Sequence, residues 1–351
     1  MTITRRRSAV AALTVAALIA VFVGLLPQFA DYNTAWRSAT SLPAAWLALL
    51  VVAATVALLV PGLQWKAAIA ELGLRQSFSI AQTSFTVSNG IPGGGAVVLP
   101  VQYSMLASFG VRRATATAAT GVTAVWNLLG TVFVPLSGLI LLLLLGERAA
   151  GSWLLAGIGV SCLVAVVVVL RFAFRSDAAA RRVGRVVAQS ITRTLATLRL
   201  DGRVRSNVDL ENAASRFRAS TDKILRRRWA LVTGAQLAAQ LTQFAVLAVA
   251  LAAIQRDLDE PTRLAAVWFA FGAGRLGTLI PITPGGLGTV DGLLTAFLVG
   301  IGGATSTDAL AAVLIWRTAT YLPGLAAGTI AFLMWRRRGG LVSPDDAHTG
   351  S

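Results

Sequence analysis

Long runs of apolar residues recur along the chain and are separated by short polar or basic segments. A helix of about 20 residues crosses the ~30 Å hydrocarbon core of a bilayer, and six runs are long enough to do so. They cover approximately residues 8–26, 44–63, 114–145, 153–170, 229–254 and 308–335, with the third interrupted at Pro135. The pattern predicts an all-α polytopic membrane protein with six full spans.

Two further pairs of apolar segments are shorter. Residues 77–91 and 96–109 flank Pro92-Gly93-Gly94-Gly95, and residues 264–280 and 289–301 flank a Pro/Gly-rich sequence from Pro281 to Gly288. Because proline and glycine interrupt helices, each pair is predicted to be a re-entrant helical hairpin that enters and leaves the membrane on the same side. A full span for the 17 residues 264–280 stays open as an alternative.

The composition agrees with a membrane location. Hydrophobic residues make up 56% of the 351 positions and charged residues 13%, against about 25% charged in soluble domains. With a single cysteine, Cys162, and a single histidine, His348, an internal disulfide is excluded and a zinc or histidine site is not expected. We therefore expect no metal and no cofactor.

Basic residues separate the two sides of the predicted topology. Of the 31 Lys and Arg residues, 25 fall in segments assigned to the cytoplasm, four outside and two within the membrane. Cytoplasmic loops of membrane proteins are enriched in Lys and Arg, so both termini are predicted to be cytoplasmic. The net charge of +16 then reflects topology, and no nucleic-acid partner is expected.

The segment 171–228 is predicted to be a basic cytoplasmic loop. It contains 15 Lys plus Arg and five acidic residues. Apolar residues at partly helical spacing from 178 to 225 allow two interpretations. The segment either forms amphipathic helices that bind anionic lipids of the inner leaflet, or it is a solvated loop that only sets the topology.

The two halves of the membrane domain carry the same order of features. In each, a short arm, a Pro/Gly break and a second short arm precede a long helix with an aromatic-polar pair, Trp126-Asn127 or Trp316-Arg317. The predicted topology inverts the second half relative to the first, as in many secondary transporters. We predict an integral membrane domain, 1–338, with halves at about 44–145 and 229–335, and a polar cytoplasmic tail, 339–351.

Both breaks have the composition of an anion-binding site near the membrane midplane. A helix that begins after a break presents unpaired N–H groups and the positive end of its dipole, and glycine lets a ligand approach the backbone closely. The residues expected to bind an anion such as a phosphate are Asn89, Gly93, Gly94, Thr283, Gly285, Gly286 and Gly288.

Three charged residues fall within predicted membrane segments: Arg275, Asp291 and Arg317. Charges at membrane depth are costly and are usually functional or paired. The two arginines leave one surplus positive charge, and arginine can bind two phosphate oxygens at once. Asp291 is expected to be a counter-ion or a protonatable coupling group. The structural alternative is that Asp291 stabilises the first turn of its helix and pairs with one arginine.

The sequence from Ile280 to Asp291, IPITPGGLGTVD, followed by Trp316-Arg317, resembles the signature of the lysylphosphatidylglycerol synthase transmembrane-domain family of flippase-like membrane domains. The resemblance extends from the second span to Arg338. It implies translocation of an anionic or aminoacylated phospholipid, or of a polyprenyl-phosphate lipid, across the bacterial cytoplasmic membrane. Family members usually have glutamate at the position of Asp291, and charged residues after the first glycine break, where this chain has none.

Other classes of function are also considered. The chain has no Walker motif and no nucleophile elbow, so neither ATP-driven transport nor catalysis is expected. An intramembrane transferase is disfavoured because the predicted membrane segments around the breaks hold one aspartate and no histidine as a general base. The main alternative is a lipid-binding scaffold that moves nothing and presents its lipid to a separate synthase. Two protein partners stay open as alternatives: a second copy of the chain, or such a synthase.

Overall fold

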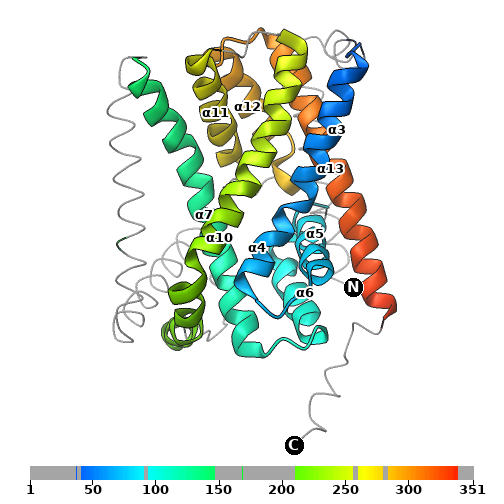
Figure 1. Ribbon diagram of the computed structural model, residues 1–351, viewed down its shortest axis with the longest axis vertical. Helices are drawn as coiled ribbons and strands as arrows, with labels where there is room; N and C mark the ends of the chain where they lie inside the picture. Colours follow the sequence, from blue (N-terminus) through cyan, green and yellow to red (C-terminus); the bar gives the residue numbers. More distant parts are fainter. Residues whose placement is uncertain are drawn as a thin grey trace, which may run out of the picture.

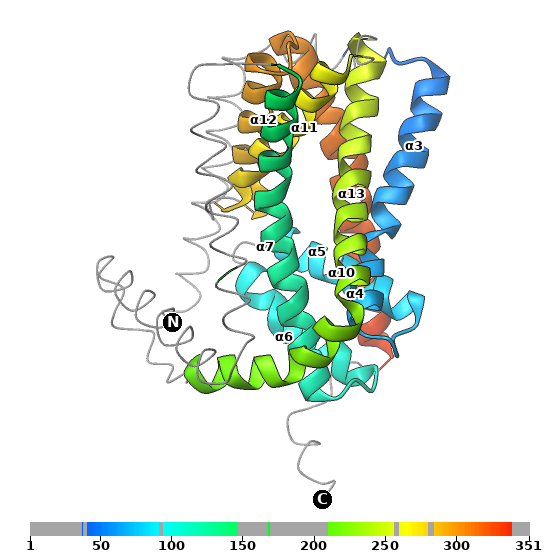
Figure 2. The same cartoon turned by 60° about the vertical axis from the view of Figure 1, so that its left-hand side comes forward.

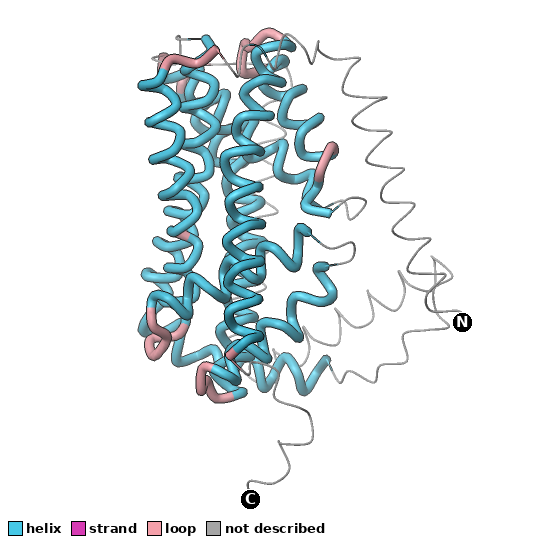
Figure 3. The backbone as a smooth tube through the Cα atoms, turned by 90° about the vertical axis from the view of Figure 1, so that its right-hand side faces the viewer, coloured by secondary structure: helices cyan, strands magenta, loops and turns pink. Residues whose placement is uncertain are grey.

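The computed structural model describes residues 37, 41–90, 94–146, 168, 210–255, 260–279 and 284–338, which are the described residues below. Within them the backbone consists of helices joined by short loops, without a strand (Figure 3). The prediction of an all-α protein is confirmed for this part of the chain.

The described helices are α3 (Ala44–Leu59), α4 (Pro61–Ala68), α5 (Leu74–Gly90), α6 (Gly94–Ser108), α7 (Arg113–Leu144), α10 (Leu210–Gln255), α11 (Pro261–Arg275), α12 (Thr289–Gly300) and α13 (Ser306–Arg337). Two short 3-10 helices, η3 (Leu276–Leu279) and η4 (Pro284–Gly286), lie between α11 and α12.

Four stretches of helix are long and apolar enough to cross a membrane. They are Ala44–Ala68, Arg113–Leu144, Arg227–Gln255 and Ser306–Arg337. These stretches correspond to four of the six predicted spans and make the chain a helical membrane protein. The other two predicted spans, 8–26 and 153–170, lie outside the described residues, apart from residue 168.

The short helices form two pairs at opposite ends of the molecule, with α5 and α6 at one end and α11 and α12 at the other (Figures 1 and 2). With 15 and 12 residues, α6 and α12 are about 22 and 18 Å long, less than the ~30 Å hydrocarbon core. This placement agrees with two re-entrant hairpins. Their path through a membrane and their inverted relation stay predictions.

Two helix ends differ from the predicted ones. Gly94 and Gly95 were expected in the first break but form the first turn of α6. Gly94 lies so close to α5 that a Cβ there would overlap the carbonyl group of Val87. In the second half, α11 ends at Arg275 and the chain continues as the tighter 3-10 turn η3, not as α-helix to residue 280.

The predicted interruption of the third span at Pro135 is wrong, because α7 continues through this residue. Proline removes one backbone donor and crowds the preceding turn, but membrane helices tolerate it where neighbouring helices and local adjustments compensate. Here α11 covers the site: a Cβ on Gly272 would overlap the backbone nitrogen of Pro135.

Helix α10 begins at Leu210 and not near residue 229. Residues 210–228, the end of the predicted basic loop, are therefore helical and continuous with the span. This part of α10 lies across the lower end of the molecule (Figure 2). Its binding to anionic lipids stays a prediction. Residues 171–209 of the predicted loop lie outside the described residues.

Buried apolar side chains form two main clusters, one in each half of the described molecule. One cluster contains Phe271, Leu294 and Trp316 and joins α11 and α12 to the upper parts of α3, α7, α10 and α13. The other contains Ile80, Met105 and Ala119 and joins α5 and α6 to α4, α7, α10 and α13. Each pair of short helices thus packs in its own core, with the long helices common to both.

Small residues bring α7 and α11 close together. A Cβ on Gly138 would lie 2.6 Å from the Cα of Phe269, and Gly272 contacts Pro135 as described above. Such small-residue contacts are the usual way in which membrane helices approach one another, because lipid supplies no hydrophobic drive for their association.

We expect the Gly272→Ala variant to lose about 1–3 kcal/mol of stability, because the added methyl group meets backbone atoms that cannot rotate away. The matched control is Gly234→Ala, which adds the same group in α10 where nothing lies within 4 Å. Alanine favours helix over glycine, so the control should be as stable as the wild type or slightly more. Thermal unfolding in detergent measures both, and equal midpoints would contradict the close packing.

Candidate functional site

The second break is shaped by three glycines with positive φ. Gly285, Gly286 and Gly288 have φ angles of 63°, 64° and 84°, values that residues with a side chain rarely adopt. Gly288 is the N-cap residue of α12. The glycines therefore allow the chain to turn from η3 into α12 within a few residues.

Asp291 lies in the first turn of α12 and is only 3% exposed. Its Oδ2 accepts a hydrogen bond from the Gly288 N–H at 2.8 Å, and its Oδ1 accepts one from Arg317 Nε at 2.5 Å. A carboxylate at this position is also favoured by the helix dipole. The N-terminus of α12 is therefore already occupied by a negative charge from the chain itself.

Arg317 of α13 holds the second break together. Besides Asp291, its guanidinium donates to the backbone carbonyls of Gly285 at 3.4 Å and Gly286 at 3.3 Å. Its central carbon lies 5.3 and 5.4 Å from the rings of Trp316 and Tyr321. Three of its five N–H donors are thus engaged, which leaves two for a ligand. The structure therefore largely agrees with the structural alternative for Asp291, in which this residue stabilises the first turn of its helix and pairs with one arginine.

The two breaks meet at Tyr321. Its hydroxyl donates to the backbone carbonyl of Asn89, in the last turn of α5, at 2.7 Å. A Cβ on Gly285 would lie 2.5 Å from the Tyr321 hydroxyl and 3.0 Å from Asn89 Oδ1. We call Asn89, Gly285, Asp291, Arg317 and Tyr321 the central cluster. It joins Asn89, predicted at the first break, to Gly285, Asp291 and Arg317 of the second half. The sequence analysis missed Tyr321.

We expect Gly285→Ala to disrupt the central cluster. The substitution forces a side chain into a positive-φ conformation, which costs about 1–3 kcal/mol, and adds a methyl group against Tyr321 and Asn89. Reduced thermal stability in detergent is the expected result. Gly303→Ala is the matched control, since Gly303 has a φ of 67° but nothing within 4 Å of a Cβ. A loss no greater than that of the control would mean that the contact with Tyr321 is unimportant.

Arg275, the last residue of α11, has a different environment. Its Nη1 donates to Gln240 Oε1 of α10 at 2.6 Å, and its guanidinium carbon lies 5.2 Å from the Phe271 ring. No carboxylate forms an ion pair with Arg275 among the described residues. Arg317 is near enough to act on it electrostatically, so two cations and one carboxylate lie in this region.

Buried glutamines extend the polar region from Arg275, and the sequence analysis missed them. Gln240 and Gln236 lie one turn apart on α10, and Gln236 accepts a hydrogen bond from Gln64 of α4 at 2.8 Å. All three are 5–6% exposed. Gly130 of α7 makes room, since a Cβ there would lie 2.5 Å from Gln236 Nε2 and 2.9 Å from Gln240 Nε2. Two glutamines four residues apart in an apolar span were the available signal.

The remaining predicted anion-binding residues are less well placed. Asn89 donates its Nδ2 to the Phe85 carbonyl within its own helix at 2.7 Å. Thr289, which is not one of the predicted residues, has its hydroxyl within hydrogen-bonding distance of the carbonyls of Gly277 and Gly286. Gly94 opens α6, whose first turn has no acidic residue. Gly93 and Thr283 lie outside the described residues.

The aromatic-polar pairs of the two halves are only partly equivalent. Trp126 donates its indole N–H to Thr233 of α10 at 2.8 Å, and Trp316 donates to the Gln243 carbonyl of α10 at 3.1 Å. Both tryptophans therefore connect their long helix to α10. Asn127, however, is exposed, whereas Arg317 belongs to the central cluster. The first half thus lacks a cation equivalent to Arg317.

Arg317 and Arg275 lie far from the N-terminal ends of their helices, a spacing that agrees with the predicted place in the membrane interior. Arg317 is 11 residues from the start of α13 at Ser306, about 17 Å along the helix axis. Arg275 is 14 residues from the start of α11 at Pro261, about 21 Å along the helix. Within the described residues no group of three or more His, Cys, Asp and Glu side chains could hold a metal ion.

The fold and the site together define a helical membrane protein in which two breaks between short helices meet near two half-buried arginines. Residues 9–328 match the family model of the lysylphosphatidylglycerol synthase transmembrane region, and the chain belongs to this family. The family suggested by the sequence is thereby confirmed, and the match includes the first predicted span and ends ten residues before Arg338. Membership indicates a function connected with membrane lipids. No curated protein matches the chain.

Proposed function

We propose that the protein translocates an anionic or aminoacylated phospholipid, or a polyprenyl-phosphate lipid, between the leaflets of the membrane. In this proposal the lipid phosphate binds at Arg275 and at the two N–H donors of Arg317 that the second break does not use. The protein performs no chemical step on the lipid. It provides a polar route across the hydrocarbon core for a headgroup that could not cross the core unaided at a useful rate.

The observation that carries this proposal is the unequal number of charges at membrane depth. Arg317 has Asp291 as its counter-ion, whereas among the described residues Arg275 has only the neutral amide oxygen of Gln240 as a hydrogen-bond acceptor. An unneutralised cation inside a membrane is costly and is usually part of a substrate or ion pathway. A phosphate would neutralise it, and the planar guanidinium is suited to bidentate phosphate binding.

The meeting of the two breaks suggests how a headgroup could be exposed to each side in turn. If the hairpins α5–α6 and α11–α12 enter from opposite sides, each forms one half of the path to the central cluster. Rocking of one half against the other would then give alternating access, as inverted repeats do in other transporters. Asp291 would serve as counter-ion to Arg317 when no lipid is bound.

The distribution of charge at the two ends supports a cytoplasmic assignment for the lower end in Figure 1. Basic residues near the ends of the helices or of the membrane-crossing stretches there are Lys66, Arg75, Arg112, Arg113, Arg227, Arg228, Arg336, Arg337 and Arg338. At the opposite end Glu260 and Asp308 accompany Arg37 and Arg263. By the positive-inside rule, the C-terminus is cytoplasmic, and we place the protein in the bacterial cytoplasmic membrane with both termini inside.

A flux assay tests the proposal. The purified protein is reconstituted into phosphatidylcholine vesicles that contain a trace of fluorescent phosphatidylglycerol or, separately, fluorescent phosphatidylcholine, and the dye in the outer leaflet is quenched chemically. Faster transfer of the anionic probe than in protein-free vesicles, with little effect on the zwitterionic probe, is expected. The same rate with and without protein, for phosphatidylglycerol and for a polyprenyl phosphate, would overturn the proposal.

One observation favours the alternative of a static lipid-binding scaffold. Arg317, Asp291 and the carbonyls of Gly285 and Gly286 already satisfy one another, so the second break has no evident need to move. A protein that retains an anionic lipid through purification but gives no flux would fit this alternative. Co-purification of a partner synthase in stoichiometric amount would support it further.

A further inference from the structure

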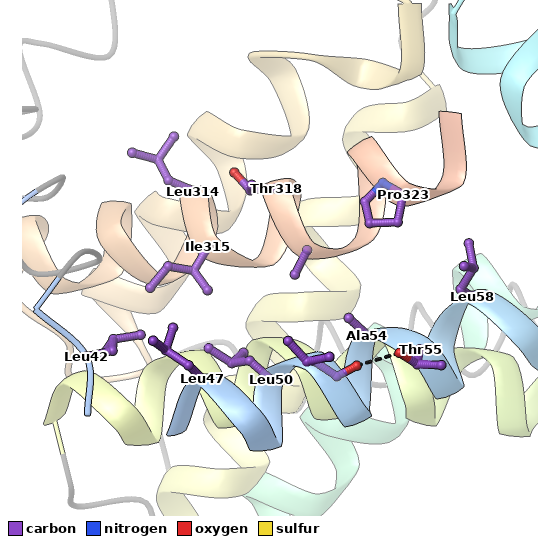
Figure 4. Close-up of a pocket in the computed structure, with 12 residues that line it drawn as sticks. Leu42, Leu47, Leu50, Ala54, Thr55, Leu58, Leu314, Ile315, Thr318 and Pro323 are labelled. Atoms are coloured by element: carbon purple, nitrogen blue, oxygen red, sulfur yellow. Dashed lines mark hydrogen bonds between the residues drawn. The ribbon is translucent and has the colours of Figure 1, made fainter. Parts of the chain in front are cut away.

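An apolar groove of about 410 Å³ runs between α3 and α13. Figure 4 shows its two walls: Leu47, Leu50 and Leu58 project from α3, and Leu314 and Ile315 project from α13. No charged residue lines it. The hydroxyl of Thr55, at one edge, donates to the Val51 carbonyl of its own helix at 2.7 Å. The groove thus offers almost only hydrocarbon to an occupant.

The position of the groove restricts what can fill it. Both walls belong to stretches long and apolar enough to cross a membrane, and only 11% of the α3–α4 stretch is buried, against 33–44% in the other three. Helix α3 is therefore the least enclosed of the four, and the groove opens toward the surrounding bilayer. A concave apolar surface facing hydrocarbon is filled by hydrocarbon, since lipid tails are as apolar as leucine.

The dimensions of the groove fit one lipid tail. From Leu47 to Leu58 it follows 12 residues of α3, about 16 Å of helix, which is close to half of the ~30 Å hydrocarbon core. Its volume lies within the ~300–1,000 Å³ typical of small-molecule sites. It ends at Pro323, beside the part of α13 that packs on α5 through Gly324 and Phe85.

The groove and the buried cation share one turn of α13. Leu314 and Thr318 line the groove, while Arg317, between them in sequence, points to Asp291 and the second break. A lipid whose phosphate lies near Arg317 and Arg275 would thus find an apolar channel on the adjacent face of the same helix. This continuity distinguishes the groove from other lipid-facing surfaces of the described helices.

We propose that the groove between α3 and α13 binds one acyl chain of the phospholipid whose headgroup lies at the arginines. This inference rests on the proposed function and assigns a second subsite to it: the arginines select the headgroup, and the groove holds the tail in the outer half of the membrane during translocation. The subsite recognises chain length and not charge.

Photo-crosslinking tests the proposal directly. Benzoylphenylalanine is introduced in place of Ala319, which lines the groove, or in place of the exposed Ala326 two turns further along α13, as the matched control. After purification in detergent and irradiation, intact-protein mass spectrometry identifies the adduct. We expect a diacyl phospholipid adduct at position 319 with at least ten times the yield at position 326, and loss of that adduct when Ala54→Trp fills the opposite wall.

Other adducts would overturn the proposal. A cross-link to a second copy of the chain would make the groove an interface, and a cross-link to residues 1–36 would show that the chain covers it. Equal lipid yields at positions 319 and 326 would mean ordinary annular lipid. Arg275→Ala separates the two proposals: it should change the headgroup of the adduct but not its yield at position 319. An unchanged headgroup in Arg275→Ala would count against the arginine site alone. Absence of the lipid adduct at position 319 from the protein that keeps both arginines would count against the groove alone.

Discussion

Replacement of Arg317 by alanine is expected to lower the free energy of unfolding by about 3–5 kcal/mol, the usual cost of removing one partner of a buried ion pair. The substitution leaves Asp291, which is 3% exposed, without its cation. It also removes the donors to the carbonyls of Gly285 and Gly286 that hold the second break. Thermal or chaotrope-induced unfolding of the purified protein in detergent measures the loss.

A double-mutant cycle identifies the ion pair as the cause. Asp291→Ala alone should also be strongly destabilising, and the double variant should lose clearly less than the sum of the two single variants, because the residues contact one another. Arg338→Ala, at the exposed C-terminal end of α13, should change stability by no more than about 0.5 kcal/mol. Additive losses at Arg317 and Asp291 would contradict the pairing.

Replacement of Arg275 by alanine is expected to slow flux of the anionic lipid by roughly 10- to 100-fold while the protein stays folded. Hydrogen bonds to charged groups contribute about 1.5–3 kcal/mol, and each 1.4 kcal/mol is a factor of about ten. Stability should suffer less than in Arg317→Ala, because Arg275 leaves behind only the neutral Gln240 and no buried carboxylate. The vesicle assay with fluorescent phosphatidylglycerol measures the flux.

The chain offers a matched control for this substitution. Arg263 donates to Gln255 of α10 at 2.7 Å, as Arg275 donates to Gln240. It lies in the first turn of the same helix α11, however, 12 residues from Arg275, which is about 18 Å along the helix. Arg263→Ala should leave flux unchanged. Arg275→Lys should restore part of it, since lysine keeps the charge but loses the bidentate geometry. Equal flux in Arg275→Ala and the wild type would remove Arg275 from the lipid site.

The sequence predicted the elements whose signal is strong and local. Uniformly apolar stretches such as 44–63 and 114–145 can hardly be anything but membrane helices, and the Pro/Gly breaks mark the ends of α5 and α11 to within a few residues. Pro135 was misjudged because its effect depends on a neighbour: Gly272, far away in the chain, lets α11 pack against the proline within an unbroken helix.

The candidate site was predictable in its residue types but not in its pairing. Three charges in apolar segments single out Arg275, Asp291 and Arg317, yet spacing alone does not show which arginine takes the carboxylate. The pairing follows from the crossing of α12 and α13, a tertiary contact. The buried glutamines were missed because a glutamine in a span is also compatible with a lipid-facing position near an interface. Only the packing of α4 on α10 shows Gln64 and Gln236 to be partners.

The central claim is that Arg275 and Arg317 select an anionic lipid headgroup, and native mass spectrometry tests it most directly. The protein is purified in mild detergent as wild type, Arg275→Ala and Arg263→Ala, and the lipids that remain bound are identified by mass. We predict a specific anionic lipid on the wild type and on Arg263→Ala, and its absence from Arg275→Ala. The same lipid retained at equal occupancy by all three proteins would contradict the account and would make Arg275 a structural residue.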